Sequence, residues 1–271
     1  MAKTAEIKDL SKKSPTEIAK ALAGRIAVMA EIGKGLQIEA IPTRLKALDT
    51  ALGCGGLPRG RIIEVFGAYG HGKTTLALHC AGQVLAGGGK VAYIDAEHAI
   101  DPAVMSWFGI DPKQLLFHQP DSGEEALDLV HTLMRSQAVT LAVVDSVAAL
   151  VPQYEIERGF AEQTIGLQAR MMSQALRKLS ISVAEARAVL IFVNQVRAKI
   201  GVFMGNNTDT PGGQALKFYA GQRWEVKRLG PIKKGDKTLG MQARVRIVKN
   251  KCAVPFKTAD LELWYGKGWQ G

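Results

Sequence analysis

Residues 67 to 74 follow the pattern of a phosphate-binding loop, in which two glycines five positions apart precede a lysine and a threonine. They read Gly67-Ala68-Tyr69-Gly70-His71-Gly72-Lys73-Thr74, and Thr75 follows. A mostly apolar run, 62–66, precedes the loop and good helix formers follow it, which is the strand–loop–helix context that the pattern requires. A glycine-rich structural turn is the alternative, but a turn does not need both flanking elements. The sequence therefore predicts a strand, a loop that binds a nucleoside triphosphate, and a helix.

The residues of this loop have separate expected roles. The glycines let backbone N–H groups curl around the β-phosphate, and the helix N-terminus adds a favourable dipole. Lys73 is expected to reach the β- and γ-phosphates, and the Thr74 hydroxyl is expected to ligate Mg²⁺. All residues from Gly67 to Thr75 are thus candidates for binding the nucleotide.

Composition limits the class of protein. A chain of 271 residues with 47% hydrophobic content can form one large α/β domain or a domain with an appendage. No apolar stretch approaches the ~20 residues of a membrane span, and the N-terminus lacks a secretory segment. Cys54, Cys80 and Cys252 are too scattered for a disulfide framework or a metal cluster, so free buried thiols are expected. We expect a soluble cytoplasmic protein with no membrane partner.

The positive charge is concentrated in one segment. The chain carries 35 basic and 25 acidic residues, a net charge of +10. Residues 217 to 257 hold twelve of the basic residues and two acids, so this segment alone accounts for the whole excess. A concentrated basic segment is the electrostatic footprint expected for a phosphate backbone. A solvated pair of surface strands is the alternative.

The first 41 residues are predicted to form a helix and a linker outside the main domain. Ser14-Pro15-Thr16-Glu17 combines a capping box with proline at the first helical position. Apolar residues then recur at helical spacing from Ile18 to Ile32, which makes an amphipathic helix. Its apolar stripe docks either on the chain's own core or on a neighbouring subunit. Residues 42–271 are predicted to form the main domain.

Within the main domain, apolar strands alternate with helices. Strands are predicted at 90–95, 115–118, 140–145 and 188–194, and helices at 123–136 and 163–185. Near-continuous apolar strands separated by helices predict a mostly parallel sheet covered on both faces. After residue 223 the pattern changes to strands joined by turns, at 224–228, 243–249 and 261–265. These strands predict an antiparallel edge.

Polar residues follow several of the predicted strands where a parallel sheet collects ligands. Asp95 and Glu97 follow one strand, Asp145 ends another, and Asn194-Gln195 ends a third. Asp145 is expected to hold Mg²⁺ through water, as in a Walker-B strand. Glu97 is expected to orient and polarise the attacking water, and Gln195 to sense the γ-phosphate. Each acid alone could instead be a helix cap or a surface ion partner.

Several segments resemble the bacterial RecA recombinase family in one continuous order, from about residue 14 to residue 268. The similar segments are 57–62, 93–99, 143–150, 169–174, 194–197 and 248–251. The resemblance implies a RecA-like P-loop ATPase core. It implies an ATP- and Mg²⁺-dependent helical filament on single-stranded DNA, which pairs with homologous duplex DNA and exchanges strands.

The resemblance also assigns roles to individual residues. It implies that Lys73, Glu97 and Gln195 act on ATP, that Asp101 approaches the adenine, and that Lys249 and Lys251 reach the neighbouring subunit's triphosphate. It further implies that the N-terminal helix packs on the adjacent protomer, and that two loops, near 153–164 and 196–214, carry DNA. The DNA-binding candidates in and beside these loops are Ile165, Arg170, Ser173, Arg177, Arg197, Lys199, Ile200, Gly212 and Gly213. Cations and backbone N–H groups bind phosphates without reading sequence, and the two isoleucines could insert between bases.

Three features depart from the family pattern. Residues 68–71 replace the usual proline, glutamate and two serines, and Val104 replaces a tyrosine expected against the adenine. The sequence stops at Gly271, where relatives usually continue into a small domain with an acidic tail, so no C-terminal domain is expected. The leading hypothesis is a DNA-dependent ATPase and strand-exchange recombinase. The alternatives are a nucleotide-gated DNA filament or regulator with weak strand exchange, and a hexameric helicase-like motor.

Overall fold

The computed structural model describes residues 14, 16–17, 38–158, 166–198 and 208–271. Contacts divide the chain into two units, Met1–Glu39 and Ala40–Gly271. In the first unit the described residues include the predicted capping box, in which the backbone N–H of Ser14 donates to Glu17 Oε2 at 2.8 Å and that of Glu17 to Ser14 Oγ at 3.4 Å. The predicted apolar helix beyond it lies outside the described residues and stays a prediction.

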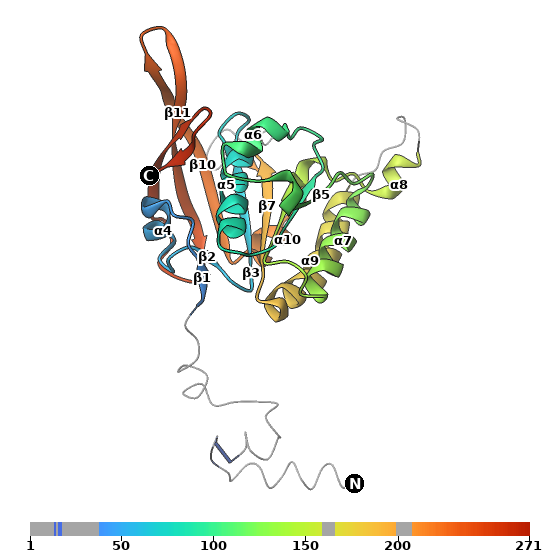
Figure 1. Cartoon of the computed structure of the whole chain (residues 1–271). Helices are drawn as coiled ribbons and strands as arrows, with labels where there is room; N and C mark the ends of the chain where they lie inside the picture. Colours follow the sequence, from blue (N-terminus) through green and yellow to red (C-terminus); the bar gives the residue numbers. More distant parts are fainter. Residues whose placement is uncertain (1–13, 15, 18–37, 159–165, 199–207) are drawn as a thin grey trace, which may run out of the picture. The chain divides into compact units, whose positions relative to one another are not determined.

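The second unit is built on a nine-stranded sheet in the order β13-β12-β11-β10-β3-β7-β6-β4-β5 (Figure 1). Six neighbouring strands, β10 to β5 in this order, run parallel, and β11, β12 and β13 add an antiparallel edge. The fold is therefore α/β with a mixed, mostly parallel sheet, as predicted. The strands are β3 Arg61–Gly67, β4 Val91–Asp95, β5 Leu115–His118, β6 Leu141–Asp145, β7 Val189–Gln195, β10 Gln222–Lys234, β11 Lys237–Asn250, β12 Thr258–Trp264 and β13 Gly268–Gln270. Short antiparallel pairs join β1 Ala40–Ile41 to β2 Leu57–Pro58, and β8 Arg197–Ala198 to β9 Thr208–Asp209.

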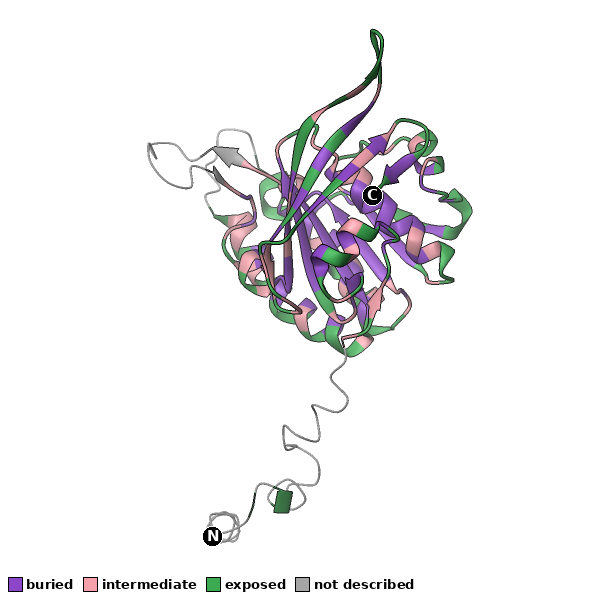
Figure 2. Ribbon diagram, turned by 90° about the vertical axis from the view of Figure 1, so that its left-hand side faces the viewer, coloured by how far each residue is buried: buried purple, intermediate pink, exposed green. Residues whose placement is uncertain are grey.

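Alternate residues of the central strands enter two different apolar layers. In β6, Leu141 and Val143 join the cluster that contains α5, whereas Ala142 and Val144 join the cluster that contains α7 and α9. This period of two follows from the pleat of a strand. Both faces are therefore buried, as the purple strands of Figure 2 show, which explains why the strands are apolar throughout. Each fully buried Leu or Val contributes about 1.5–3 kcal/mol.

Three long helices provide most of the cover. They are α5 Lys73–Ala86, α7 Gly123–Arg135 and α9 Leu167–Ala186. The start of α7 is fixed because the Ser122 hydroxyl accepts the N–H of Glu125, and an arginine in the last turn favours the C-terminal end. The remaining helical segments are α4 Lys46–Leu52, α6 Pro102–Ser106, η1 Pro112–Gln114, η2 Val147–Ala149, α8 Gln153–Ile156 and α10 Ala215–Tyr219. Along the part of the chain that the structure describes, none of the helices is both long and apolar enough to cross a membrane.

The hairpin of β10 and β11 extends beyond the rest of the sheet (Figures 1 and 2). The two strands pair from Gln222↔Asn250 to Lys234↔Lys237, and Gly235 with φ 60 begins the turn between them. Three exposed lysines, Lys233, Lys234 and Lys237, lie at its end and are called the hairpin-tip lysines below. The sequence predicted these strands but made them shorter, because the distal half lacks the apolar alternation of a buried strand.

Candidate functional site

The phosphate-binding loop connects β3 to α5, as the sequence predicted. Lys73 is the first residue of α5 and is 8% exposed. Its Nζ donates to the carbonyl of Ala68 at 2.8 Å, so the side chain folds back over the loop. Burial lowers the pKa of Lys73, while the negative charges of Asp145 and Glu97 oppose that shift. A desolvated ammonium beside two carboxylates is positioned to bind a phosphate strongly, since water competes little there.

Two glycines of this loop lie in close contact with β10 and β11. Gly72 has φ 86, and a Cβ there would lie 2.4 Å from Met241 Cε. A Cβ on Gly67 would lie 2.3 Å from the carbonyl oxygen of Val226. A side chain at Gly67 would displace the backbone of β10. At Gly72 the positive φ disfavours other residues, and the Met241 side chain would have to shift. The hairpin strands therefore support the loop directly.

The two unusual loop residues behave differently. Tyr69 is 93% exposed, so its ring projects into solvent. His71 Nδ1 lies 3.0 Å from the carbonyl oxygen of Val226 on β10 and donates to it. This hydrogen bond ties the loop to the first strand of the basic hairpin.

Asp145 ends β6 beside the start of α5. Its Oδ2 accepts the hydroxyl of Tyr93 at 2.8 Å. Burial raises the pKa of Asp145 to about 6, and hydrogen bonds from Thr74 and Tyr93 oppose that shift. The Thr74 hydroxyl and the Asp145 carboxylate thus meet, as the sequence predicted for a magnesium site.

This pair fits Mg²⁺. Both side chains present oxygen, the ligand type that Mg²⁺ prefers, and Mg²⁺ usually keeps several waters and phosphate oxygens rather than a full protein cage. No group of three or more His, Cys, Asp or Glu side chains suited to a metal lies among the described residues. One hydroxyl and one carboxylate beside the loop are a sufficient donor set when waters and phosphate oxygens supply the remaining ligands.

Glu97 and Gln195 come together from strands that are not neighbours. Gln195 Nε2 donates to Glu97 Oε1 at 2.9 Å, and the Ser146 hydroxyl donates to the same oxygen. Glu97 follows β4 and Gln195 ends β7, and β6, which precedes Ser146, lies between them. Glu97 remains exposed, so its carboxylate faces solvent beside the loop. The carboxylate predicted to polarise water and the predicted γ-phosphate sensor are directly hydrogen-bonded.

Other residues named from the sequence have local structural partners. Asp95 is 1% exposed, and its carboxylate accepts the N–H groups of Ala99 and Ile100 at 3.3 and 3.2 Å. Asp101 caps α6, since its Oδ1 accepts the N–H of Ala103 at 2.8 Å. Val104 packs partly buried against the core. Asp95 therefore shapes the segment that carries Glu97.

Lys249 and Lys251 lie together near the end of β11. Lys249 Nζ donates to the carbonyls of Lys217 and Phe218 at 2.5 and 3.0 Å, and Lys251 Nζ to that of Phe218 at 3.4 Å. Burial lowers the pKa of Lys249, and the charges of Lys251 and Arg223 add to this effect. Two ammonium groups are thus held close together on carbonyls of α10.

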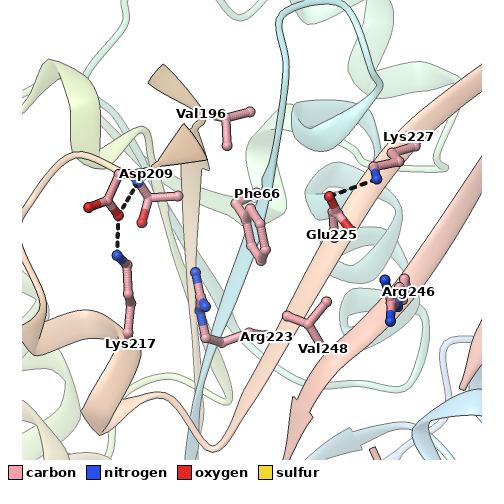
Figure 3. Close-up of a pocket in the computed structure, with 10 residues that line it drawn as sticks. Phe66, Val196, Asp209, Lys217, Arg223, Glu225, Lys227, Arg246 and Val248 are labelled. Carbon is pink, nitrogen blue, oxygen red and sulfur yellow. Dashed lines mark hydrogen bonds and ion pairs between the residues drawn. The ribbon is translucent and has the colours of Figure 1, made fainter. Parts of the chain in front are cut away.

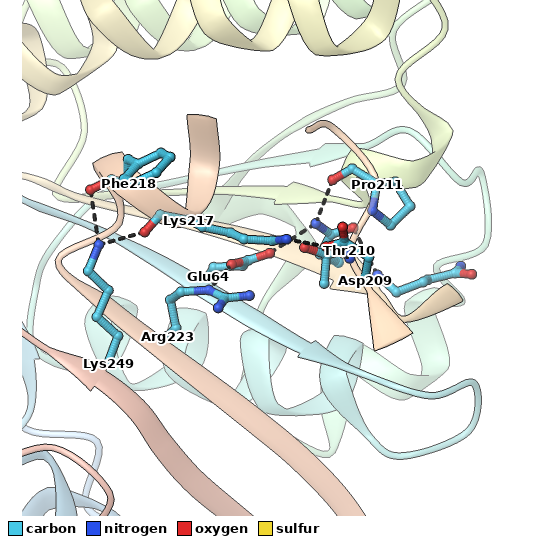
Figure 4. A network of polar contacts seen from close by, with 10 residues as sticks. Glu64, Asp209, Thr210, Pro211, Lys217, Phe218, Arg223 and Lys249 are labelled. Atoms are coloured by element: carbon cyan, nitrogen blue, oxygen red, sulfur yellow. Dashed lines mark hydrogen bonds and ion pairs between the residues drawn. The ribbon is translucent and has the colours of Figure 1, made fainter. Parts of the chain in front are cut away.

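A buried polar network connects β3, β7 and β10 (Figure 4). Glu64 is fully buried, its Oε2 accepts Arg223 Nε at 2.5 Å, and its Oε1 accepts Asn194 Nδ2 at 3.0 Å. Asn194 also donates to the carbonyl of Pro211 at 3.1 Å. Asn194, which directly precedes Gln195, therefore connects the C-terminal part of the 196–214 loop to β3, the strand that leads into the phosphate-binding loop.

A cleft of ≈ 460 Å³ lies between described residues of the 196–214 segment and the strands β10 and β11 (Figure 3). Phe66 and Val196, together with Val248, contribute its apolar part, and Arg223 stacks over the Phe66 ring at 4.5 Å. The other lining residues are Asp209, Thr210, Lys217, Glu225, Lys227 and Arg246. Cations predominate, with Lys217 paired to Asp209 and Lys227 to Glu225.

Described residues of both predicted DNA-binding regions lie on α9 or near its start. Arg170, Ser173 and Arg177 follow one another at helical spacing, and both arginines are exposed. Gly212 and Gly213, with φ 84 and 76, approach η2 and the start of α9, where a Cβ on Gly213 would lie 2.8 Å from Ala169 Cβ. Arg197 belongs to β8. Ile165, Lys199 and Ile200 lie outside the described residues, so their predicted roles stay predictions.

Comparison with known sequences decides the family. A family model described as the RecA N-terminal domain matches residues 11–270. The chain belongs to the RecA family. Protein RecA of Symbiobacterium thermophilum is 51% identical over 90% of this chain and 70% of that protein. Protein RecA of Thermus aquaticus is 51% identical over 90% of this chain and 72% of that protein. Protein RecA of Bacillus subtilis is 51% identical over 86% of this chain and 67% of that protein.

A solved structure also supports the fold. The crystal structure of the RadB recombinase superposes with a TM-score of 0.63 at 23% identity, covering 85% of this chain and 98% of that one. At this identity the likeness concerns the fold alone. The predicted RecA-like α/β core is thus confirmed.

Sequence reasoning did not single out three residues of this RecA-family site. The Tyr93 hydroxyl bonds to Asp145, the Ser146 hydroxyl bonds to Glu97, and Glu64 anchors the network behind Gln195. Glu64 could have been recognised from the sequence, because an isolated acid within the apolar run 62–66 predicts a buried carboxylate that is paired with another polar group. Tyr93 and Ser146 had none, because their partners lie on other segments of the sheet.

Proposed function

We propose that this RecA-family protein is an ATP-dependent homologous recombinase. It forms a helical filament on single-stranded DNA, pairs that DNA with a homologous duplex and exchanges strands during DNA repair in the cytoplasm. The observation that carries the proposal is the meeting of Lys73, Glu97 and Gln195 at one end of the sheet. The family and the excess of positive charge beside this site support it.

The ATPase role rests on the charges at this site. The backbone of residues 67–75 and Lys73 bind the phosphates, and Glu97 holds the attacking water and accepts its proton. Ser146 and Gln195 both donate to Glu97 Oε1, which orients the carboxylate. Asp101 approaches the adenine, as the resemblance implies. Thr74 and Asp145 would hold Mg²⁺, which neutralises charge on the transferred phosphoryl group when bound.

Gln195 connects nucleotide state to DNA binding. A γ-phosphate next to its amide competes for the hydrogen bond to Glu97, and the adjacent Asn194 is bonded to Pro211 in the second loop. Arg170, Ser173, Arg177, Arg197, Lys199 and the glycine pair Gly212 and Gly213 bind the DNA backbone without reading sequence, and Ile165 and Ile200 enter between bases. The basic hairpin attracts the duplex.

Lys249 and Lys251 complete the triphosphate site of the adjacent subunit. Two ammonium groups held together repel each other, so an arriving phosphate stabilises both. In this arrangement they take the role of an arginine finger. A contact between two different surfaces of the subunit propagates as an open helix, which makes ATP part of the filament interface.

The first experiment measures ATP hydrolysis with and without single-stranded DNA, followed by strand exchange on a long duplex. Lys73→Ala is expected to abolish nucleotide binding, and Glu97→Gln to lower kcat by roughly 10²–10⁴ with binding retained. Lys90→Ala and Glu185→Gln, exposed residues that precede β4 and β7 at the opposite end of the sheet, are the matched controls. Unstimulated hydrolysis contradicts a DNA-dependent ATPase. Stimulated hydrolysis without exchange favours the alternative, a nucleotide-gated DNA filament or regulator.

The second experiment tests the shared site by mixing two inactive variants. Lys73→Ala lacks a working phosphate loop, and the double variant Lys249→Ala/Lys251→Ala lacks the lysines given to the neighbour. In an equal mixture, about a quarter of the junctions join an intact loop to intact lysines. DNA-stimulated hydrolysis is therefore expected to return to roughly that fraction. A mixture as inactive as its components contradicts a site shared between subunits.

A further inference from the structure

Two of the three cysteines lie beside each other although 198 positions separate them in the sequence. Cys54 is in the loop between α4 and β2, and Cys252 follows β11. The backbones are in close contact there, because a Cβ added to Gly53 would lie 2.5 Å from that of Ala253. The Cys54 thiol donates to the carbonyl of Gly56 at 3.3 Å. Each of the two thiols perturbs the pKa of the other, and both residues are half-buried.

Amide side chains hold the two segments together. Asn250 Nδ2 donates to the carbonyl of Leu52 at 2.9 Å, and its Oδ1 accepts the N–H of Cys252 at 2.9 Å. Gln222 Nε2 donates to that same Oδ1 at 3.2 Å and lies 3.8 Å from Cys54 Sγ. The approach of the two thiols is therefore built into the fold.

The two sulfurs differ in ionisation. The hydrogen bond from Cys252 is the largest cause that lowers the pKa of Cys54 to about 7, helped by the N–H groups around it and opposed by burial. The pKa of Cys252 is raised, mainly because it donates to Cys54, and Arg61 opposes that rise. Cys80 is fully buried, which raises its pKa to about 12. Cys54 is thus the nucleophilic thiol, since the thiolate is the reactive form.

We propose that Cys54 and Cys252 form an oxidation site that peroxide converts to an intramolecular disulfide. The Cys54 thiolate attacks one oxygen of hydrogen peroxide, the O–O bond breaks, and the leaving hydroxide takes up a proton as water. The sulfur is oxidised to a sulfenic acid. Cys252 then attacks that sulfur, the S–O bond breaks, and the departing hydroxide combines with the Cys252 proton as a second water.

The second step is favoured by the neighbours of Cys252. Oxidation removes the negative charge of Cys54 and its capacity to accept the Cys252 proton, which are causes of the raised pKa of Cys252. The guanidinium of Arg61 remains and stabilises the new thiolate. Cys252 is therefore positioned to act as the resolving thiol.

The disulfide would restrain the segment that carries Lys251. Lys251 directly precedes Cys252, and its N–H donates to the carbonyl of Gly221 at 2.8 Å. A covalent bond at Cys252 limits the shift that lets Lys251 leave α10 for a neighbouring triphosphate. This consequence rests on the proposed function, whereas the oxidation chemistry does not.

The test treats the folded 271-residue chain, without nucleotide or DNA, with hydrogen peroxide. Remaining thiols are then blocked with iodoacetamide, and peptides are analysed by mass spectrometry. A Cys54–Cys252 cross-linked peptide is expected while Cys80 stays reduced. Before oxidation, alkylation of Cys54 is expected to be at least about tenfold faster than that of Cys252 at pH 7. Equal slow alkylation, or no cross-link at peroxide levels that spare Cys80, overturns the proposal.

Two variants identify the steps. Cys252→Ser is expected to accumulate a Cys54 sulfenic acid that dimedone traps, and Cys54→Ser to leave Cys252 reduced. Circular dichroism melts verify that both variants fold, and the reaction of the unmodified chain tests the proposal without them. Oxidation is expected to lower DNA-stimulated ATP hydrolysis severalfold in the unmodified chain and not in Cys54→Ser. Unchanged hydrolysis with the disulfide present overturns the link to Lys251.

Discussion

Replacing Arg223 by methionine should destabilise this protein far more than removing a surface arginine. Arg223 Nε lies 2.5 Å from Oε2 of Glu64, whose side chain is fully buried. Without the guanidinium, the carboxylate keeps one neutral donor, Asn194 Nδ2 at 3.0 Å. Removing one partner of a buried ion pair costs about 3–5 kcal/mol, because the remaining charge has lost its solvation. With a shift of about 2–4 °C per kcal/mol, the melting temperature should fall by roughly 10 °C.

The decrease in the free energy of unfolding is measured by urea unfolding of the nucleotide-free protein, followed by circular dichroism. Arg244→Met is the matched control, since Arg244 pairs with Asp260 on the surface at side-chain exposures of 48% and 55%. Exposed pairs contribute little, so the control is expected to unfold almost as the unmodified chain does. The double variant Glu64→Gln/Arg223→Met removes both charges while keeping an acceptor for Asn194. It is expected to recover most of the lost stability.

Two outcomes would refute this reasoning. A cost below about 1 kcal/mol for Arg223→Met would mean that water solvates the Glu64 carboxylate and that the pair behaves as a surface pair. A double variant no more stable than Arg223→Met would mean that the arginine acts through packing on Phe66 rather than through the charge of Glu64.

Three further predictions concern the metal, a buried histidine and the hairpin. Tyr93→Phe removes the hydroxyl that donates to Asp145 Oδ2 at 2.8 Å. A hydrogen bond to a charged group contributes about 1.5–3 kcal/mol. Calorimetry should therefore show that Mg²⁺-dependent ADP binding is weakened roughly tenfold and that Mg²⁺-free binding is unchanged. Burial lowers the pKa of His79, whose Nε2 donates to the Thr43 carbonyl at 2.8 Å. The folded state thus favours neutral imidazole, so this contribution to the unfolding free energy is fully present above about pH 6.5 and is lost as pH falls through the lower folded-state pKa. In urea titrations the gap between the unmodified chain and His79→Gln should therefore shrink from pH 8 to pH 5, and a constant gap contradicts this. Changing the three hairpin-tip lysines to alanine should weaken duplex binding and lower its salt-dependence slope by up to about 3, with single-strand binding unchanged; equal losses on both DNAs would argue against a duplex-specific role.

Local patterns in the sequence determined most of the elements. The glycine spacing before Lys73 and Thr74 requires a loop between a strand and a helix. Strands that are apolar on both faces require helices or strands packed against both faces of the sheet. Strands joined by turns after residue 223 indicated an antiparallel edge. These inferences succeed because a phosphate loop and a buried strand depend on residues that are neighbours in the chain.

Tertiary structure alone decided which of these residues meet. Glu97 accepts a hydrogen bond from Gln195 because β6 separates β4 from β7 and brings Ser146 between them. Glu64 lies opposite Arg223 in the parallel register of β3 and β10. Strand order and register depend on packing across the whole sheet, which no local pattern encodes. The sequence by itself therefore determined the phosphate loop and the candidate catalytic groups, and only the fold decided their hydrogen-bond partners.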